Sequence, residues 1–164
     1  MRRLYCAGVW EHNEGIFHAA KHCLTGRGIA LICGRHPAQL AGADLALLTV
    51  SPGAAGWAGA GALDCRTVLL PGAAGPLARA LRADCAVSYG TSPKDSLTFS
   101  SLDGNRICLA VQRELVTLDG AVLERQELVL PFPPGLAPSV FLAWAGTLLL
   151  AGLPPEQVRW PDGV

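Results

Sequence analysis

Hydrophobic residues in the first half of the chain form short continuous runs, separated by glycine, proline and polar residues. The runs have the length of strands, and the segment between the first two has helical spacing and stops at Gly26. Parallel strands that are covered on both faces give continuous apolar runs of this kind. We therefore expect a βαβ unit at the N-terminus and a mostly parallel sheet of about five strands flanked by helices. The predicted strands are 3–9, 28–34, 44–50, 65–72 and 85–90, the first helix is 15–25, a short helix begins at Gly75, and 51–62 is a flexible loop rich in Gly and Ala.

The pattern changes after residue 95. Strand-like runs occur in pairs, one pair about Asp103-Gly104-Asn105 and one about Asp119-Gly120. Asp-Gly turns between such runs favour β-hairpins, so residues 96–130 should be antiparallel. An apolar segment at 137–152 predicts a closing helix. The expected fold class is α/β, with a mostly parallel, P-loop-like sheet and antiparallel hairpins in the C-terminal half, and residues 1–164 should form a single domain.

The stretch from residue 6 to residue 18, CAGVWEHNEGIFH, has the outline of a phosphate-binding loop. An apolar run ends near Gly8, polar residues follow, and Gly15 leads into the predicted helix. A second stretch, DLALLTVS at 44–51, follows a strand pattern that begins with Asp and ends with Ser. The later stretches LLPG at 69–72 and AVSYG at 86–90 precede the antiparallel section, and the chain closes with PPGLAPSVFLAWAGTLLLAGLPPEQV.

In this order, these stretches resemble the central ATP-binding domain of the Mur ligases, which join amino acids to peptidoglycan precursors, and of the related folate polyglutamate synthases. The resemblance covers roughly residues 4–158. Its implied phosphate loop has the form G-x-T-G-T-N-G-K-T-T, and here Gly15 stands in the position of the lysine. Ile16 and Phe17 replace the hydroxyl residues, and Thr49 replaces the glutamate that helps hold magnesium in that family. The residues that would meet adenine, and the family's later His-Asn pair, are also replaced.

The loop residues argue against the reaction that this family performs. A phosphate loop needs a lysine to offset the phosphate charge and a hydroxyl to ligate magnesium. This loop has neither, and Glu11 and Glu14 add negative charge, which costs on the order of 1 to 4 kcal/mol per charge pair at ~4 Å. We also expect neither of the ligases' neighbouring domains in this chain. ATP-dependent ligase activity is therefore not expected.

Composition narrows the classes of partner. The chain is 51% hydrophobic and 16% charged, with 13 basic and 13 acidic residues. The absence of a basic excess argues against nucleic acid, and the low charge favours a homo-oligomer. Six cysteines without a CxxC pair are expected to be reduced core residues of a cytoplasmic protein. The uncharged segment 135–153 is interpreted as a buried helix rather than a membrane span, because it contains a proline and three glycines.

Two sets of residues are candidates for a site. The first is a ligand-binding set of Glu11, His12 and Asn13 in the first loop, with Thr91, Ser92 and Lys94 after the fifth strand. Ligands in α/β sheets bind beyond the carboxyl ends of the strands. The alternative, which we favour for the second loop, is that its polar residues stabilise local turns.

The second set could hold zinc. His18 and His22 are four residues apart on the predicted helix, and Cys33 and His36 end the next strand. Imidazole and thiolate groups are the usual zinc ligands. The alternative is that the histidines flank a packed helix and Cys33 belongs to the core.

The sequence thus favours a non-catalytic relative of the Mur ligase central domain that acts as a binding or interaction protein, through self-association. The alternative is a small-molecule- or metal-dependent enzyme that uses the loops at 10–15, 51–62 and 90–95. The sequence names no ligand, and no cofactor is predicted apart from the zinc alternative.

Overall fold

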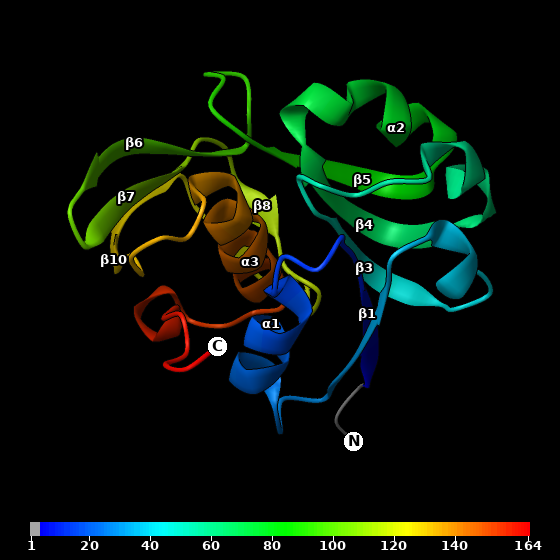
Figure 1. The fold of residues 1–164 in the computed structure, drawn as a ribbon, viewed down its shortest axis with the longest axis horizontal. Helices are drawn as coiled ribbons and strands as arrows, with labels where there is room; N and C mark the ends of the chain where they lie inside the picture. Colours follow the sequence, from blue (N-terminus) through cyan, green and yellow to red (C-terminus); the bar gives the residue numbers. More distant parts are fainter. Residues whose placement is uncertain (1–3) are drawn as a thin grey trace.

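A computed structural model describes residues 4–164. Its main element is a mixed sheet of 8 strands in the order β10-β7-β6-β5-β4-β3-β1-β2, accompanied by a 2-stranded sheet of β8 and β9 (Figure 1). The strands are β1 Tyr5–Trp10, β2 Ile29–Gly34, β3 Leu45–Val50, β4 Asp64–Pro71, β5 Arg82–Tyr89, β6 Leu97–Asp103, β7 Arg106–Val111, β8 Leu115–Val116, β9 Val122–Leu123 and β10 Gln126–Pro131. The helices are α1 Ile16–Leu24, α2 Gly75–Ala80 and α3 Pro138–Leu150, with short 3-10 turns η1 Pro37–Gln39, η2 Trp57–Ala62, η3 Gly72–Ala74 and η4 Pro155–Gln157.

Strands β2, β1, β3, β4 and β5 run parallel, as the apolar runs predict. Antiparallel pairing begins beyond β6, which joins β7, and β7 in turn joins β10. The two parts of the sheet meet at one pair only, Tyr89 with Leu97. The expected α/β class, with a mostly parallel sheet and an antiparallel C-terminal part, is confirmed.

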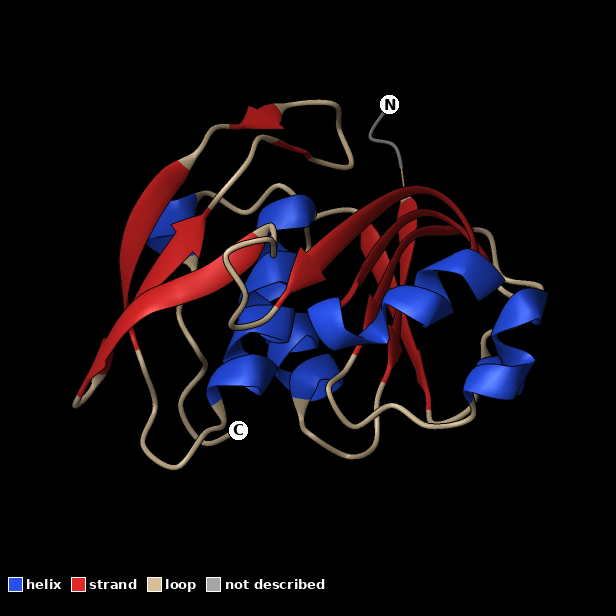
Figure 2. Ribbon diagram, turned by 90° about the horizontal axis from the view of Figure 1, so that it is seen from above, coloured by secondary structure: helices blue, strands red, loops and turns tan. Residues whose placement is uncertain are grey.

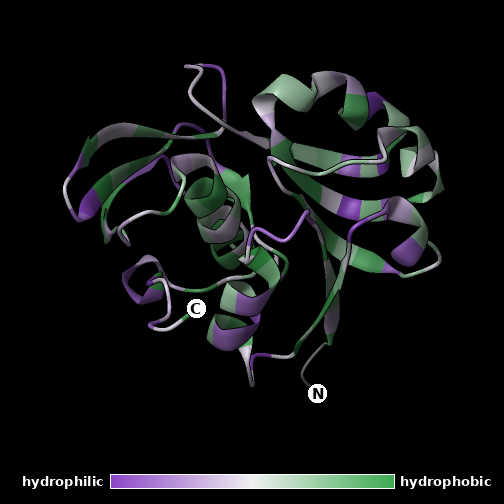
Figure 3. Cartoon of the chain, viewed as in Figure 1, coloured by the Kyte–Doolittle hydropathy of each residue, from purple (hydrophilic) through white to green (hydrophobic). Residues whose placement is uncertain are grey.

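Helices cover both faces of the sheet (Figure 2). On one face α1 and α3 pack in a core that includes Leu69 and Tyr89, and on the other face η1, η2 and α2 cover a second core around Trp10 and Leu48. Figure 3 shows hydrophobic colours along α3, which is buried almost all round. A helix that is hydrophobic on every side belongs in the interior of a protein. Within residues 4–164, no helix combines the length and the apolar character needed to cross a membrane.

Four details differ from the sequence-based expectation. The loop at 51–62 contains a 3-10 turn, and β5 begins at Arg82, directly after α2. The hairpin about Asp119-Gly120 has strands of only two residues, and Leu118 in its turn donates its N–H to the Leu150 carbonyl at the end of α3. The cysteines are all free, but the prediction that they lie in the core is wrong for Cys33 and Cys85, which are exposed.

Candidate functional site

The loops that follow the parallel strands gather at the carboxyl edge of the sheet, where α/β proteins usually bind ligands. The loop after β1 turns sharply into α1. Asn13 has φ 62° and Gly15 has φ 87°, so two residues adopt the left-handed conformation within three positions. Glycine adopts this conformation without strain, whereas a side chain at residue 15 would be strained. The expected turn between the first strand and the first helix is therefore present in the predicted place.

The Glu11 carboxylate lies at the N-terminus of α1, the end of a helix at which proteins commonly bind anions. Its side chain is only 7% exposed. One carboxylate oxygen accepts the backbone N–H of Ile16 at 2.9 Å, and the other accepts that of Phe17 at 3.2 Å. These are the first N–H groups of α1, which have no partner inside the helix and carry its positive dipole. The N–H groups thus converge on the chain's own carboxylate.

Glu14 ties the same loop to the end of β3. Its Oε1 accepts the backbone N–H of His12 and the hydroxyl of Ser51, both at 2.7 Å, and its Oε2 accepts the N–H of Gly53 at 2.9 Å. A side chain at residue 53 would lie 3.2 Å from this carboxylate. The two glutamates therefore have separate structural roles, one at the helix and one between loops.

Among the predicted ligand residues of this loop, Glu11 points inward, whereas His12 and Asn13 are exposed. The structure therefore separates these three neighbours. The Glu11 carboxylate accepts hydrogen bonds from Ile16 and Phe17, and neither His12 nor Asn13 bonds to it.

Thr49, at the position of the implied magnesium ligand, is fully buried. Thr147 donates its hydroxyl to the Ala143 carbonyl at 2.7 Å, so Thr49 must be the donor in the 2.6 Å bond between the two threonine hydroxyls. The side chain is therefore directed towards α3, on the face of the sheet, and connects strand to helix.

The loop after β5 closes over the ends of β4 and β5 through Asp95, which is 5% exposed. A Cβ at Gly72 would lie 2.0 Å from its Oδ1, and a Cβ at Gly90 would lie 2.5 Å from its Oδ2. The Ser92 N–H donates to Oδ2 at 3.1 Å. Both glycines are thus required by the close approach of a carboxylate, and Asp95 fills the space that larger residues at position 72 would occupy.

The other candidates in this loop are exposed, namely Thr91, Ser92 and Lys94. The amide of Gln112 donates to the carbonyl oxygens of Pro93 at 3.2 Å and Asp95 at 2.8 Å, and Arg113 donates to the Lys94 carbonyl at 2.8 Å. The Ser92 hydroxyl accepts the Lys94 N–H at 3.2 Å. These bonds are those of a stabilised turn, as the alternative interpretation describes.

The candidate zinc ligands do not meet. His18 and His22 lie on the exposed side of α1, and Cys33 is exposed on β2. His36 lies against Gly56 and Gly59, and its Nδ1 accepts the N–H of Ala38 at 3.1 Å. Across residues 4–164, no three His, Cys, Asp or Glu side chains are placed to hold one metal ion together.

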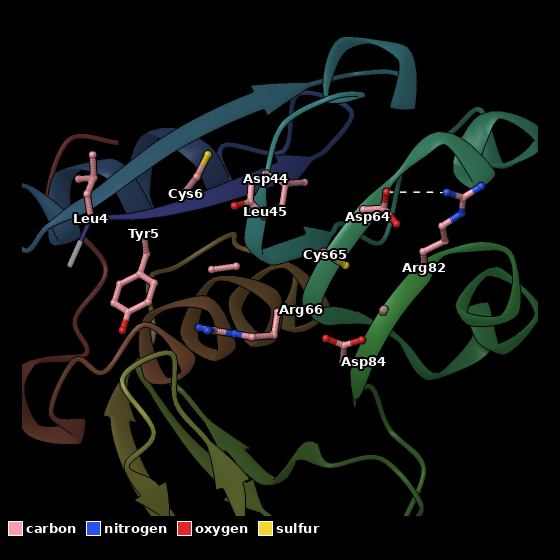
Figure 4. Close-up of a pocket in the computed structure, with 12 residues that line it drawn as sticks. Leu4, Tyr5, Cys6, Asp44, Leu45, Asp64, Cys65, Arg66, Arg82 and Asp84 are labelled. Atoms are coloured by element: carbon pink, nitrogen blue, oxygen red, sulfur yellow. Dashed lines mark ion pairs between the residues drawn. The ribbon is translucent and has the colours of Figure 1, made fainter.

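A cleft of about 780 Å³ lies at the opposite, amino edge of the parallel strands (Figure 4). Asp64 forms an ion pair with Arg82 at 3.9 Å, and both side chains are largely exposed. The Arg66 guanidinium lies 5.6 Å from the centre of the Tyr5 ring and donates to the Leu118 carbonyl at 3.0 Å. Because the cleft lies at an open edge and its side chains carry charges of both signs, it indicates no particular class of ligand.

Two buried acids have strongly perturbed titration. Burial, with smaller contributions from Asp64 and Asp84, raises the pKa of the Cys65 thiol to about 12. Burial, and then the Glu14 carboxylate, raises the pKa of the Tyr89 phenol. The phenol donates to the Val50 carbonyl at 2.6 Å. Both groups keep their protons at neutral pH, so neither supplies a nucleophile.

Sequence reasoning identified the first loop but missed the roles of Glu14 and Asp95. A signal existed for Asp95, because glycines at the ends of two successive strands mark a close approach by another group. The partner of those glycines lies in a later loop and cannot be identified from spacing.

No model of a known protein family matches this chain, and no curated protein matches it significantly.

Proposed function

We propose that this chain is a non-catalytic relative of the Mur ligase central domain that acts as a binding or interaction protein. The observation that carries the proposal is the Glu11 carboxylate on the N–H groups of Ile16 and Phe17. A carboxylate tethered to the loop competes with any phosphate for these donors at very high effective concentration. It also repels a phosphate that approaches within a few ångströms.

Two further positions support the same conclusion. Thr49, in place of the implied magnesium ligand, donates its hydroxyl to Thr147 on α3. Asp95 lies against Gly72, where the resemblance implies contacts with adenine. The residues that the resemblance implies for phosphate, metal and base are therefore each engaged with other parts of the chain. ATP chemistry at this edge would require three separate rearrangements.

Thermal unfolding with and without ATP and Mg²⁺ tests the proposal. We expect no concentration-dependent rise in Tm for the wild-type chain, because a ligand stabilises a protein only by binding its folded state. A saturable rise in Tm with ATP would contradict the proposal. Thermal unfolding with zinc tests the alternative, a metal-dependent enzyme. Stabilisation by zinc that disappears in the double variant His18→Ala/His22→Ala would support a metal site.

Self-association belongs to the same proposal, and sedimentation over a range of protein concentrations tests it. The low charge of the chain favours it, since copies without net charge do not repel one another. A monomer at every concentration would direct the search for a partner to other proteins.

A further inference from the structure

The strand β2 forms one end of the 8-stranded sheet, with β1 on one side and, within residues 4–164, no strand on the other. Tyr5 donates its N–H to the Gly28 carbonyl and Glu11 donates to the Gly34 carbonyl. Because bonds in a parallel pair come from alternate residues, the even-numbered residues of β2 bond to β1. Ile29, Leu31 and Cys33 consequently direct their backbone groups outward, with three N–H donors and three carbonyl acceptors.

The β2 edge, defined as Ile29–Gly34, lacks the features that prevent strand addition. Its sequence, IALICG, contains no charge and no proline. The opposite outer edge has both: Phe132 donates to Asn105, so the outward residues of β10 are Glu127, Val129 and Pro131. A charged side chain and a proline without an N–H protect an edge against pairing. One edge of this sheet is thus protected and the other is open.

The surroundings of the β2 edge are basic although the chain as a whole is neutral. Residues 15–43 contain Lys21, Arg27 and Arg35 and no Asp or Glu. All three are exposed, as are His18 and His22 on α1, whose outer side is hydrophilic in Figure 3. Within residues 4–164, the only ion pair joins Asp64 and Arg82, so none of these three charges is neutralised by a salt bridge.

These observations select the kind of strand that fits. A second copy would pair antiparallel about a two-fold axis at Leu31 to use all the outward groups, and this register places Arg27 of each copy opposite Arg35 of the other. Like charges directly opposite each other destabilise a strand pair. A strand with an apolar centre and acidic ends meets the same groups without repulsion.

We propose that the β2 edge binds an extended segment of another protein, apolar in its centre and flanked by Asp or Glu, as an added strand. Main-chain bonds from Ile29, Leu31 and Cys33 provide affinity, and Arg27 and Arg35 select acidic ends. This inference rests on the proposed function as an interaction protein and names the class of its partner.

The test uses the full chain and a labelled probe peptide, acetyl-Asp-Asp-Val-Thr-Val-Thr-Val-Asp-Asp-amide, with fluorescence anisotropy as the readout. We expect saturable binding that weakens as salt is added. The same peptide with Lys for Asp, or with proline for both threonines, should not bind. Binding of either control peptide as tightly as the probe would overturn the inference, and so would a lack of binding by the probe.

Variants of the protein locate the site. Leu31→Pro removes one outward N–H and should weaken binding about tenfold, which corresponds to one hydrogen bond at an interface. The matched control, Val129→Pro on the protected edge, should leave affinity unchanged. Exposed Cys33 provides a second pair that does not depend on a proline being tolerated: Cys33→Asp should weaken binding and Cys33→Lys should not. Equal effects of the two proline variants, or of the two Cys33 variants, would overturn the assignment to β2.

Two further results separate the possible failures. A dimer in sedimentation that Leu31→Pro converts to monomer would identify a second copy as the occupant and overturn the inference. If the probe peptide fails to bind and ATP also fails to bind, the inference is wrong while the non-catalytic proposal remains. ATP binding would refute the proposed function itself.

Discussion

Glu11 is the residue whose removal most directly tests how the first loop is held. Its carboxylate is 7% exposed and accepts two backbone N–H groups at the start of α1. A hydrogen bond to a charged group contributes roughly 1.5–3 kcal/mol net, and loss of a helix cap costs roughly 0.5–2 kcal/mol. Because the two bonds share one acceptor group and are not additive, we expect Glu11→Ala to reduce the free energy of unfolding by about 3 kcal/mol.

Glu11→Gln should destabilise the fold less than Glu11→Ala does. The amide keeps one acceptor oxygen but has an NH₂ group in place of the other, so one helical N–H loses its partner and the negative charge at the positive end of α1 is lost. We expect about half the effect of Glu11→Ala. Urea unfolding at neutral pH measures both values. Glu127→Ala, an exposed glutamate on β10, is the matched control and should change stability by less than about 0.5 kcal/mol.

Glu11→Ala also tests whether the start of α1 binds an external anion once the carboxylate is removed. Without the carboxylate, the N–H groups of Ile16 and Phe17 are free to donate hydrogen bonds to an external anion. Pyrophosphate at about ten times its Kd would then restore ~1.4 kcal/mol to Glu11→Ala, whereas the wild-type chain should not respond. A loss of less than about 0.5 kcal/mol in Glu11→Ala, or equal stabilisation of both chains by pyrophosphate, would refute the idea that Glu11 fills an anion site.

Three other predictions concern the core and the second loop. Gly72→Ala should displace Asp95 and lower stability by about 2 kcal/mol, and adding Asp95→Ala should recover part of that loss in a double-mutant cycle; strict additivity would contradict the contact. Iodoacetamide at mildly alkaline pH should label exposed Cys33 well before buried Cys65, because a pKa of about 12 leaves Cys65 a thiol. Mass spectrometry of protein labelled in its folded state measures the order, and labelling of Cys65 as early as Cys33 would contradict the burial of Cys65. The pKa values of Cys65 and Tyr89 are raised in the fold, so above about pH 9 these two groups bind more protons in the folded state than in the unfolded state. Their contribution to stability should therefore be constant below that pH and be lost between about pH 9 and pH 12. Chemical unfolding should give a flat profile between about pH 9 and pH 12 only if these groups are not perturbed.

The parallel half of the fold was predictable because its signal is local. Runs such as Leu45–Val50 are buried on both faces, so nearly every residue is apolar and the run itself marks the strand. The turn at Gly15 was predictable for a similar reason, since glycine between a strand and a helix indicates a left-handed residue. The register and the order of the strands depend on which faces α1 and α3 cover, and no single segment carries that information.

The candidate site was harder to predict than the fold. The sequence located the loop and showed Gly15 where the resemblance implies a lysine, but Glu11 and Glu14 were interpreted only as repulsive charges. Each carboxylate has partners at a distance that spacing does not reveal: Glu14 bonds to Ser51 and Gly53 from a different loop. The exposed position of Cys33 was missed because an uncharged edge strand and a buried strand have the same apolar composition.

The two proposals meet at Glu11. Its carboxylate fills the donors of α1, while its backbone N–H donates to the Gly34 carbonyl at the end of β2, at 3.1 Å. A loop that binds phosphate depends on its ligand to satisfy these donors, whereas this loop satisfies them in the free protein and holds its shape without one. The carboxyl end of β2 is therefore fixed in place without a nucleotide. A preformed strand with open hydrogen-bonding groups loses little entropy when another strand adds to it, so the bonds that Glu11 makes favour recognition at the adjacent edge.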